Sequence, residues 1–310
     1  MIGAGLIVAR LLHYVAVTTL AGASFFPLCM YAGAEPRALS RWRQRLLLVA
    51  IVVAVLSGLL WFMLSVASMS GTLAGMSDPQ VIWTVIHDTG FGEVWAVRML
   101  IAVVALVAIS MRGGPAAVRK DLVAPAFAAL LLASLAGVGH SQIEEGGAGV
   151  IHMLSDLAHL LAAGTWLGGL LPLGYVLLLC GRKSINAREM ELDHVLQRFS
   201  RMGYFAVATL IGSGLINSWF LVGTVRALLT TWYGQLLCAK LVMFAGMLAL
   251  GASNRFRLVP SLTKTHADDL DRTLALVAQL RNQVLGEQIL GLLVLLAVSA
   301  LGTMQPAIGQ

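Results

Sequence analysis

The chain has 310 residues, of which 58% are hydrophobic and only 12% are charged, and its mean hydropathy is +0.85. Soluble domains carry about 25% charged residues, so the composition excludes a soluble globular protein and predicts an integral membrane protein. The net charge of +6 does not indicate a nucleic-acid partner, because it comes from arginines in the connections between apolar segments.

Apolar segments of about 20 residues alternate with short polar connections, which is the pattern of a membrane-spanning helical bundle. The sequence predicts eight spans, over residues 4–32, 44–68, 91–111, 120–139, 151–180, 200–222, 235–256 and 284–304. The longest polar stretch, about residues 254–283, is too short to hold its own core. We therefore expect one all-α membrane domain over residues 1–310, in contact with lipid.

Basic residues concentrate in every second connection. The connections after spans one, three, five and seven, with the span ends beside them, hold Arg37, Arg41, Arg43, Arg45, Arg112, Arg119, Lys120, Arg182, Lys183, Arg188, Arg198, Arg201, Arg255, Arg257, Lys264, Arg272 and Arg281. The other connections and the C-terminal tail contain only Arg226. Because Lys- and Arg-rich loops stay in the cytoplasm, we expect both termini to face the outside, which in a bacterium is the periplasm.

The two halves of the chain resemble each other. LHYVAVTTLAGASF in the first span matches AHLLAAGTWLGGLL in the fifth, so that His13 corresponds to His159. SGLLWF in the second span matches SGLINSWF in the sixth, with Trp61 paired to Trp219. Arg98 and Lys240 each follow a glycine by six residues.

The matches predict two parallel four-helix repeats, residues 1–145 and 146–310, related by a pseudo-twofold axis along the membrane normal. His13 and His159 would then lie at similar depth and would be able to approach each other. Transporters commonly place their sites at the interface between such repeats.

The fifth span begins with a polar stripe. His152, Asp156 and His159 are spaced by four and three residues and therefore share one face of a helix. Ionisable side chains inside a membrane are expensive and mark a functional site by default. Near the inner end of the last span, Glu287 and Gln288 are candidates for a second polar path.

Histidine and methionine gather on the expected outer side of the membrane. Five of the seven histidines lie there, with two methionines in the outer connection nearby: His13, His87, His140, His152, His159, Met69 and Met76. Imidazole suits copper, zinc, iron and nickel, and thioether selects Cu(I). The set predicts copper as the ligand, although a single methionine serves equally well as an apolar filler.

We expect His13, His152 and His159 to bind the ion, which would enter past His87, His140 and Met69 or Met76. Asp156 would orient an imidazole as a second-shell residue. Arg98 and Lys240 would bind anionic groups, or balance the charge of Asp156 and Glu93, or simply extend to the outer headgroups. The sequence contains no Walker A loop, HExxH motif or nucleophile elbow, so we expect no enzyme.

The chain resembles the copper resistance D (CopD) family of bacterial inner-membrane proteins. The resemblance rests on LHYVA at residues 12–16, DLAHLLAAGTWLGGLLPL at 156–173, YGQLLCAKL at 233–241 and GASNRFRLVP at 251–260. It implies copper homeostasis and resistance, through uptake of periplasmic copper with a small copper-binding partner of the CopC type, here a separate chain.

The first span also looks like the first helix of a family of membrane haem proteins, with a His followed by a Gly nine residues later. That likeness implies an alternative, in which His13 and His159 are the axial ligands of a b-type haem and the protein is a redox carrier. Arg98 and Lys240 would then meet the haem propionates.

Overall fold

A computed structural model describes residues 2–111, 122–137, 146–181, 191–265 and 269–309. All regular secondary structure in these ranges is helical. The α-helices are α1 (Ile2–Met30), α2 (Arg37–Ser70), α3 (Pro79–Asp88), α4 (Gly90–Ser110), α5 (Val123–Ala136), α6 (Gly146–Cys180), α7 (Leu192–Val222), α8 (Val225–Thr230), α9 (Trp232–Ser253), α10 (Val259–Lys264) and α11 (Leu270–Leu301). Two short 3₁₀ segments, η1 (Leu73–Ser77) and η4 (Ala307–Gly309), and a π-helical turn, η3 (Asn254–Leu258), complete the described elements.

Seven described helices are long and apolar enough to cross a membrane. They are α1, α2, α4, α6, α7, α11 and the continuous helix Trp232–Lys264, which joins α9, η3 and α10. The remaining expected span corresponds to α5, an apolar helix of 14 residues. A membrane-spanning bundle is therefore confirmed, whereas the count of eight spans stays a prediction at α5.

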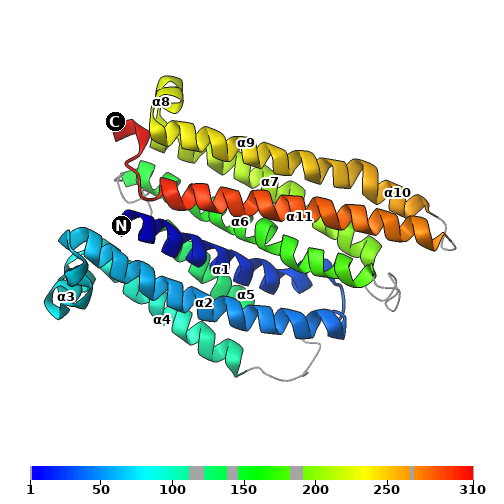
Figure 1. Cartoon of the computed structure of the whole chain (residues 1–310), viewed down its shortest axis with the longest axis horizontal. Coiled ribbons are helices and arrows are strands. Elements are labelled where there is room, and N and C mark those ends of the chain that lie inside the picture. Colours follow the sequence, from blue (N-terminus) through cyan, green and yellow to red (C-terminus); the bar gives the residue numbers. More distant parts are fainter. Residues whose placement is uncertain (1, 112–121, 138–145, 182–190, 266–268, 310) are drawn as a thin grey trace.

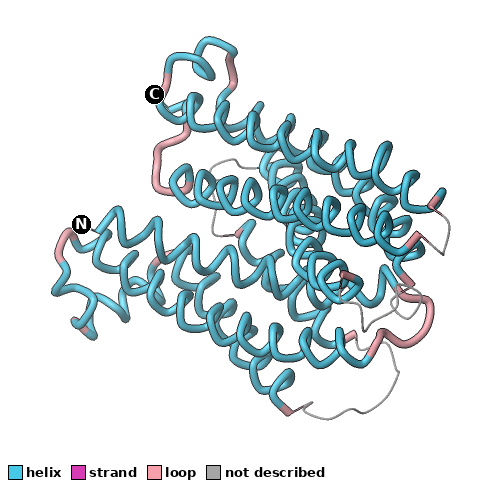
Figure 2. Tube along the Cα trace, turned by 45° about the vertical axis from the view of Figure 1, so that its right-hand side comes forward, coloured by secondary structure: helices cyan, strands magenta, loops and turns pink. Residues whose placement is uncertain are grey.

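The long helices form one bundle with α1 and α6 in contact at its centre (Figure 1). Helices α2, α4 and α5 lie on one side of this pair, and α7, α9 and α11 on the other (Figure 1). Figure 2 shows from a second direction that the two chain termini lie at the same end of the bundle. We call this end, where α3 and α8 also lie, the terminal end. The opposite end, where α2 begins with four arginines, is the arginine end.

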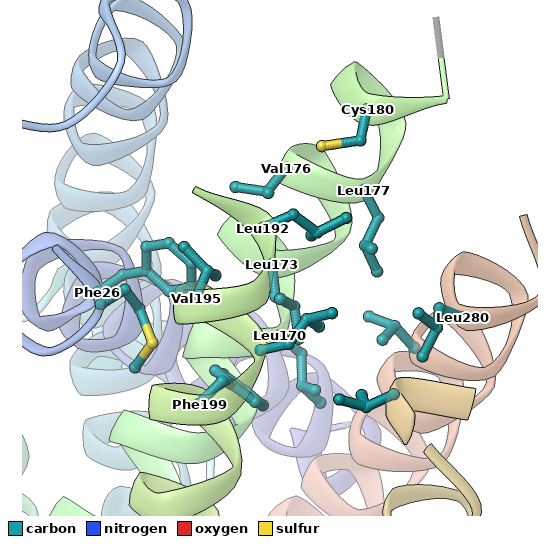
Figure 3. Packing of buried hydrophobic residues seen from close by; sticks show 14 of the residues in the cluster. Phe26, Leu170, Leu173, Val176, Leu177, Cys180, Leu192, Val195, Phe199 and Leu280 are labelled. Atoms are coloured by element: carbon teal, nitrogen blue, oxygen red, sulfur yellow. The ribbon is translucent and has the colours of Figure 1, made fainter. Parts of the chain in front are cut away.

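Two large apolar clusters fill the bundle. One packs the terminal half of α1 against α2, α4 and α5. The other surrounds the last four turns of α6, where Leu170, Leu173 and Leu177 meet residues of α1, α7 and α11, including Phe26, Phe199 and Leu280 (Figure 3). The buried polar residues discussed below pack against the edges of these clusters, as His13 does against Trp61 and Trp95.

Glycines bring α1 and α6 into backbone contact. A Cβ atom on Gly22 would overlap the backbone of Gly168 and Gly169, and a Cβ on Gly168 would overlap the carbonyl of Thr18. Small residues permit such close approach of helices in membranes, where packing rather than water exclusion holds helices together. The close packing of α1 and α6 is therefore explained by these two glycines.

Helices α4 and α9 begin with the same threonine cap. Thr89 Oγ1 accepts a hydrogen bond from Gly92 N at 3.0 Å and donates to Val85 O at 2.6 Å. Thr231 Oγ1 accepts from Gly234 N at 3.0 Å and donates to Ala227 O at 2.7 Å. Each threonine thus caps its helix and ties it to the short helix before it. These matched caps agree with the expected repeat locally, while the overall two-repeat arrangement stays a prediction.

Candidate metal site

His13 lies in a closed hydrogen-bond network. Its side chain is fully buried, and Nδ1 lies 3.0 Å from Ala54 O and 3.1 Å from Ser57 Oγ. Because a carbonyl only accepts hydrogen bonds, Nδ1 carries the proton. The lone pair of Nε2 then accepts from Arg98, whose Nη2 and Nε lie at 2.6 and 3.2 Å. Both ring nitrogens of His13 are therefore occupied by protein groups.

Arg98 is fully buried and ties three helices together. Arg98 lies on α4 and bonds His13 of α1. It also bonds α5, where its Nη1 donates to Leu131 O at 2.6 Å and to Ser134 Oγ at 2.5 Å. Within the described residues it makes no ion pair, since the one ion pair found there joins Arg43 and Glu35. The interpretation in which Arg98 extends to the outer headgroups is wrong, because its guanidinium bonds inside the bundle.

The surroundings of His13 are rich in hydrogen-bond donors and positive charge. Arg98 lies 5.8 Å from the ring centre of Trp95, and Arg10 lies 5.0 Å from that of Trp61. Arg10 Nε and the indole N–H groups of both tryptophans are buried without an acceptor among the described residues. A metal cation is disfavoured there, because two guanidinium groups repel it and no described carboxylate is bonded to either of them.

His159 occupies the corresponding position on α6 but keeps one nitrogen open. Its Nδ1 lies 2.9 Å from Ser213 Oγ, and that hydroxyl donates to Thr209 O at 2.5 Å. Since the hydroxyl proton is used, Ser213 accepts from Nδ1–H, and the lone pair remains on Nε2. No described side chain donates a hydrogen bond to Nε2, which leaves it in the tautomer that binds metals.

Asp156 and His152 continue the same face of α6 toward the terminal end. Asp156 Oδ1 accepts from Asn217 Nδ2 of α7 at 3.4 Å and interacts electrostatically with Lys240 of α9. His152 is buried with its ring stacked on Phe220, 4.7 Å between centres. The predicted stripe of three polar residues is therefore turned toward α7 and α9, inside the protein, and it brings a carboxylate to the side of His159.

Sequence comparison paired Trp61 with Trp219, and the structure gives a different correspondence. Trp219 is 73% exposed, whereas Trp61 is buried against His13. Counting four residues from each serine, it is Asn217 that corresponds to Trp61, and Asn217 contacts Asp156. An aromatic wall beside His13 is thus replaced by a polar side chain near His159, which makes the second site more suitable for an ion.

The other predicted ligands lie apart from this face. His87 is exposed on α3 and lies against Trp83, with 4.0 Å between ring centres. Met69 is 54% exposed near the end of α2, and Met76 lies half-buried in η1. His140 falls outside the described residues. Among the described residues, no three His, Cys, Asp or Glu side chains are grouped as metal ligands, and no contact joins His13 to His159.

The serines that hold both histidines were not predicted from the sequence. Ser57 and Ser213 each precede a glycine, at which a Cβ would lie 3.4 Å from Cε1 of His13 and 3.7 Å from Cε1 of His159 respectively. The Ser-Gly pair common to SGLLWF and SGLINSWF was the available signal, because the duplicated dipeptide combines a hydroxyl with the space for a ring.

Comparisons with known proteins cover both halves of the chain. Residues 1–150 match a family described as copper resistance protein D-like, N-terminal domain, and residues 193–301 match one described as copper resistance protein D. No solved structure matches the chain.

Three relatives extend these matches. The chain is 31% identical over 253 residues to Inner membrane protein YebZ of Escherichia coli (strain K12), covering 79% of this chain and 82% of that protein. It is 29% identical over 313 residues to Copper resistance protein D of Pseudomonas syringae pv. tomato, covering 97% and 96%. It is 31% identical over 253 residues to Copper transport protein CutJ of Bacillus subtilis (strain 168), covering 78% of this chain and 44% of that protein.

The expected family resemblance is thereby confirmed, while the haem alternative gains no support from the comparisons. The family models run through residues 1–150, which carry His13 and the Ser57 motif, and through residues 193–301, while His152, Asp156 and His159 lie between them. The apolar helices agree with the membrane location in the name of YebZ. The chain belongs to the copper resistance protein D family of bacterial inner-membrane proteins.

Proposed function

We propose that this protein carries copper from the periplasm across the inner membrane, as a transporter and not as an enzyme. The observation that carries the proposal is the open Nε2 of His159, with Asp156 one turn away on the same buried face of α6. A borderline-soft ion such as copper binds neutral imidazole well, and a neighbouring carboxylate offsets its charge. The names of the related Copper resistance protein D and Copper transport protein CutJ support copper as the cargo.

The two histidine sites divide the work unequally in this proposal. At His13, Arg98 occupies the position that a metal would take. The half of the bundle that contains His13 would therefore have a structural role. At His159 the equivalent cation, Lys240, interacts electrostatically with Asp156 and with His159 and makes no described hydrogen bond to the ring, so an entering ion would share the carboxylate with Lys240. If the two four-helix repeats are equivalent, as we propose, one has kept the transport site and the other has converted it into a structural network.

We propose that the terminal end faces the periplasm, because the described connections at the opposite end carry the arginines. Copper would then arrive near exposed His87 and Met69, delivered by a separate partner of the CopC type. His152, buried one turn before Asp156, would take part in the transfer toward His159. Several moderately weak ligands along a path allow an ion both to enter and to leave.

Replacing His159 with alanine is expected to abolish copper binding by the purified protein, because the open imidazole nitrogen is lost. Copper per polypeptide is measured by elemental analysis after loading with Cu(I) and desalting, and iron is measured in the same samples. The matched control is His194→Ala, an exposed histidine at the start of α7 outside the site, which should keep full occupancy.

A second comparison separates the two histidine sites. His13→Ala should keep copper binding but lower thermal stability, since it leaves Arg98 buried without its main partner. Full copper occupancy in a folded His159→Ala variant would refute the site. Stoichiometric iron that is lost on removing both histidines would instead show a haem protein.

A further inference from the structure

A buried carboxylate lies in the membrane far from the proposed copper site. Glu287 of α11 is only 3% exposed. It lies 14 residues before the end of that helix at Leu301, about 21 Å along the axis at the usual rise per residue. Along α11 it is therefore near the middle of the helix, while its partner Asn254 lies 22 residues after the start of α9 at Trp232 and 10 residues before the end of α10 at Lys264, in the half of that continuous helix nearer the arginine end.

The partners of Glu287 are neutral. Asn254 Nδ2 donates a hydrogen bond to Glu287 Oε1 at 2.7 Å. A Cβ atom on Gly251 would lie 3.9 Å from Glu287 Oε2, so the backbone of α9 passes close to the second oxygen. These contacts place the carboxylate between α11 and the point where α9 becomes the π-helical turn η3.

Among the described residues, no positive charge pairs with Glu287. The elements around Glu287 carry several titratable groups. They include Arg255 and Arg257 of η3, Arg281 of α11 and Tyr175 of α6. None of them interacts electrostatically with its carboxylate, and none of the described basic groups forms an ion pair with it. A bare carboxylate in this position is strongly disfavoured, so it requires a proton or a bound cation.

Two buried amide oxygens without described partners belong to a residue that bonds Glu287 and to one a helical turn away from it. Asn254 Oδ1 and Gln283 Oε1 are both buried, and neither has a hydrogen-bond donor among the described residues. Asn254 holds its amide against Glu287, and Gln283 lies one turn before Glu287 on the same face of α11. The neighbouring Gln288 is already used, because its Nε2 donates to Leu170 O at 2.8 Å.

The backbone also departs from a regular α-helix at Asn254. Asn254 is the first residue of η3, the only π-helical turn in the described chain. Single π-turns interrupt the regular hydrogen-bond ladder and frequently occur at functional sites. Asn254 itself keeps α-helical backbone angles, φ −56° and ψ −51°, so the π-turn begins directly at the residue that bonds Glu287.

We propose that Glu287, Asn254 and Gln283 form a binding site for a small hard cation, either a proton or Na⁺, in the cytoplasmic half of the membrane. The chemistry is that of oxygen ligands with one negative charge, which suits hard cations and does not suit Cu(I). The site is therefore separate from that of His159, and its cation would be a coupling ion whose binding and release accompany movement of the cargo. This cation site is inferred from the contacts of Glu287 and does not require that the cargo be copper.

The test is modification of the full-length protein in detergent by dicyclohexylcarbodiimide, without copper. This reagent adds the carboxyl oxygen to its central carbon and takes up the carboxyl proton on nitrogen, so it reports a protonated carboxyl in an apolar environment. Peptide mass spectrometry locates the adduct, and Glu287→Gln supplies the background. We expect modification of Glu287 at mildly acidic pH and its loss at alkaline pH or on adding sodium in place of choline.

The variants test the two amide oxygens. Gln283→Ala and Asn254→Ala should shift the pH at which modification is lost, or remove protection by sodium. Asn282→Ala, an exposed amide next to Gln283 on the same helix, should behave as wild type. Protection by high pH alone identifies the proton as the ligand, and protection by sodium identifies Na⁺. Modification that ignores both pH and sodium, or no modification of Glu287 under any condition, would overturn the site.

Discussion

Alanine at Gly168 is expected to prevent stable folding of the bundle. The added Cβ would overlap the carbonyl of Thr18, and the obstacle is backbone, which cannot turn away as a flexible side chain can. Overpacking usually costs about 1–3 kcal/mol, and we expect at least the top of that range here because α1 and α6 must separate along their whole contact. Thermal unfolding of the purified protein, followed by size-exclusion chromatography of heated samples, measures the effect.

The matched control is Gly212→Ala on α7. Nothing lies within 4 Å of the position of its Cβ, so the substitution only lowers the backbone entropy of the unfolded chain. This variant should be as stable as wild type or slightly more stable, with a gain of about 0.4–1 kcal/mol. Equal stability of Gly168→Ala and wild type would show that the two helices do not cross at these glycines.

Methionine at Arg98 is expected to lower stability by roughly 3 kcal/mol, because His13 Nε2 and Ser134 Oγ lose their donor and Leu131 O keeps only its bonds within α5. His13 Nε2, Leu131 O and Ser134 Oγ all accept from this guanidinium, and they belong to α1 and α5. Methionine fills much of the volume, so the loss reports hydrogen bonding more than a cavity. Arg98→Lys should recover only part of it, since one ammonium lacks the planar fork that reaches both helices.

Thermal melts of Arg98→Met beside Arg226→Met make this measurement, because Arg226 is exposed in α8 and its loss should change little. Copper binding adds a second readout. Folded Arg98→Met should keep its copper, since the proposed ligand is His159. An unchanged melting temperature would mean that the network around His13 contributes nothing to stability, and a selective loss of copper would move the metal site to His13.

Much of the fold was accessible from the sequence because the membrane imposes simple rules. Uninterrupted apolar segments must be helices, since the hydrocarbon core offers no partner for free backbone groups. The expected span at 151–180 agrees with α6, although the helix itself starts earlier, at Gly146. The short α3 and α8 were not expected, because each is a local turn held by a threonine cap to the next helix.

The candidate site was predicted in its residues and only partly in its arrangement. Helical spacing was enough to place His152, Asp156 and His159 on one face, and that face is indeed turned inward. Identical spacing made His13 and His159 look equivalent. The difference between them depends on whether a cation of a neighbouring helix reaches the ring, and Arg98 reaches His13 with two nitrogens while no described group donates to His159 Nε2.

By itself, the sequence determined a helical membrane protein of the copper resistance protein D family, with polar residues buried along α6. Those properties follow from composition, from the period of the helix and from motifs, which are all local. Only the tertiary structure decided which histidine keeps a nitrogen without a described donor, and that Glu287 meets Asn254 with no described basic group paired to it. The physical reason is that hydrogen bonds between side chains depend on distances between helices far apart in the chain, and helical spacing contains no information about those distances.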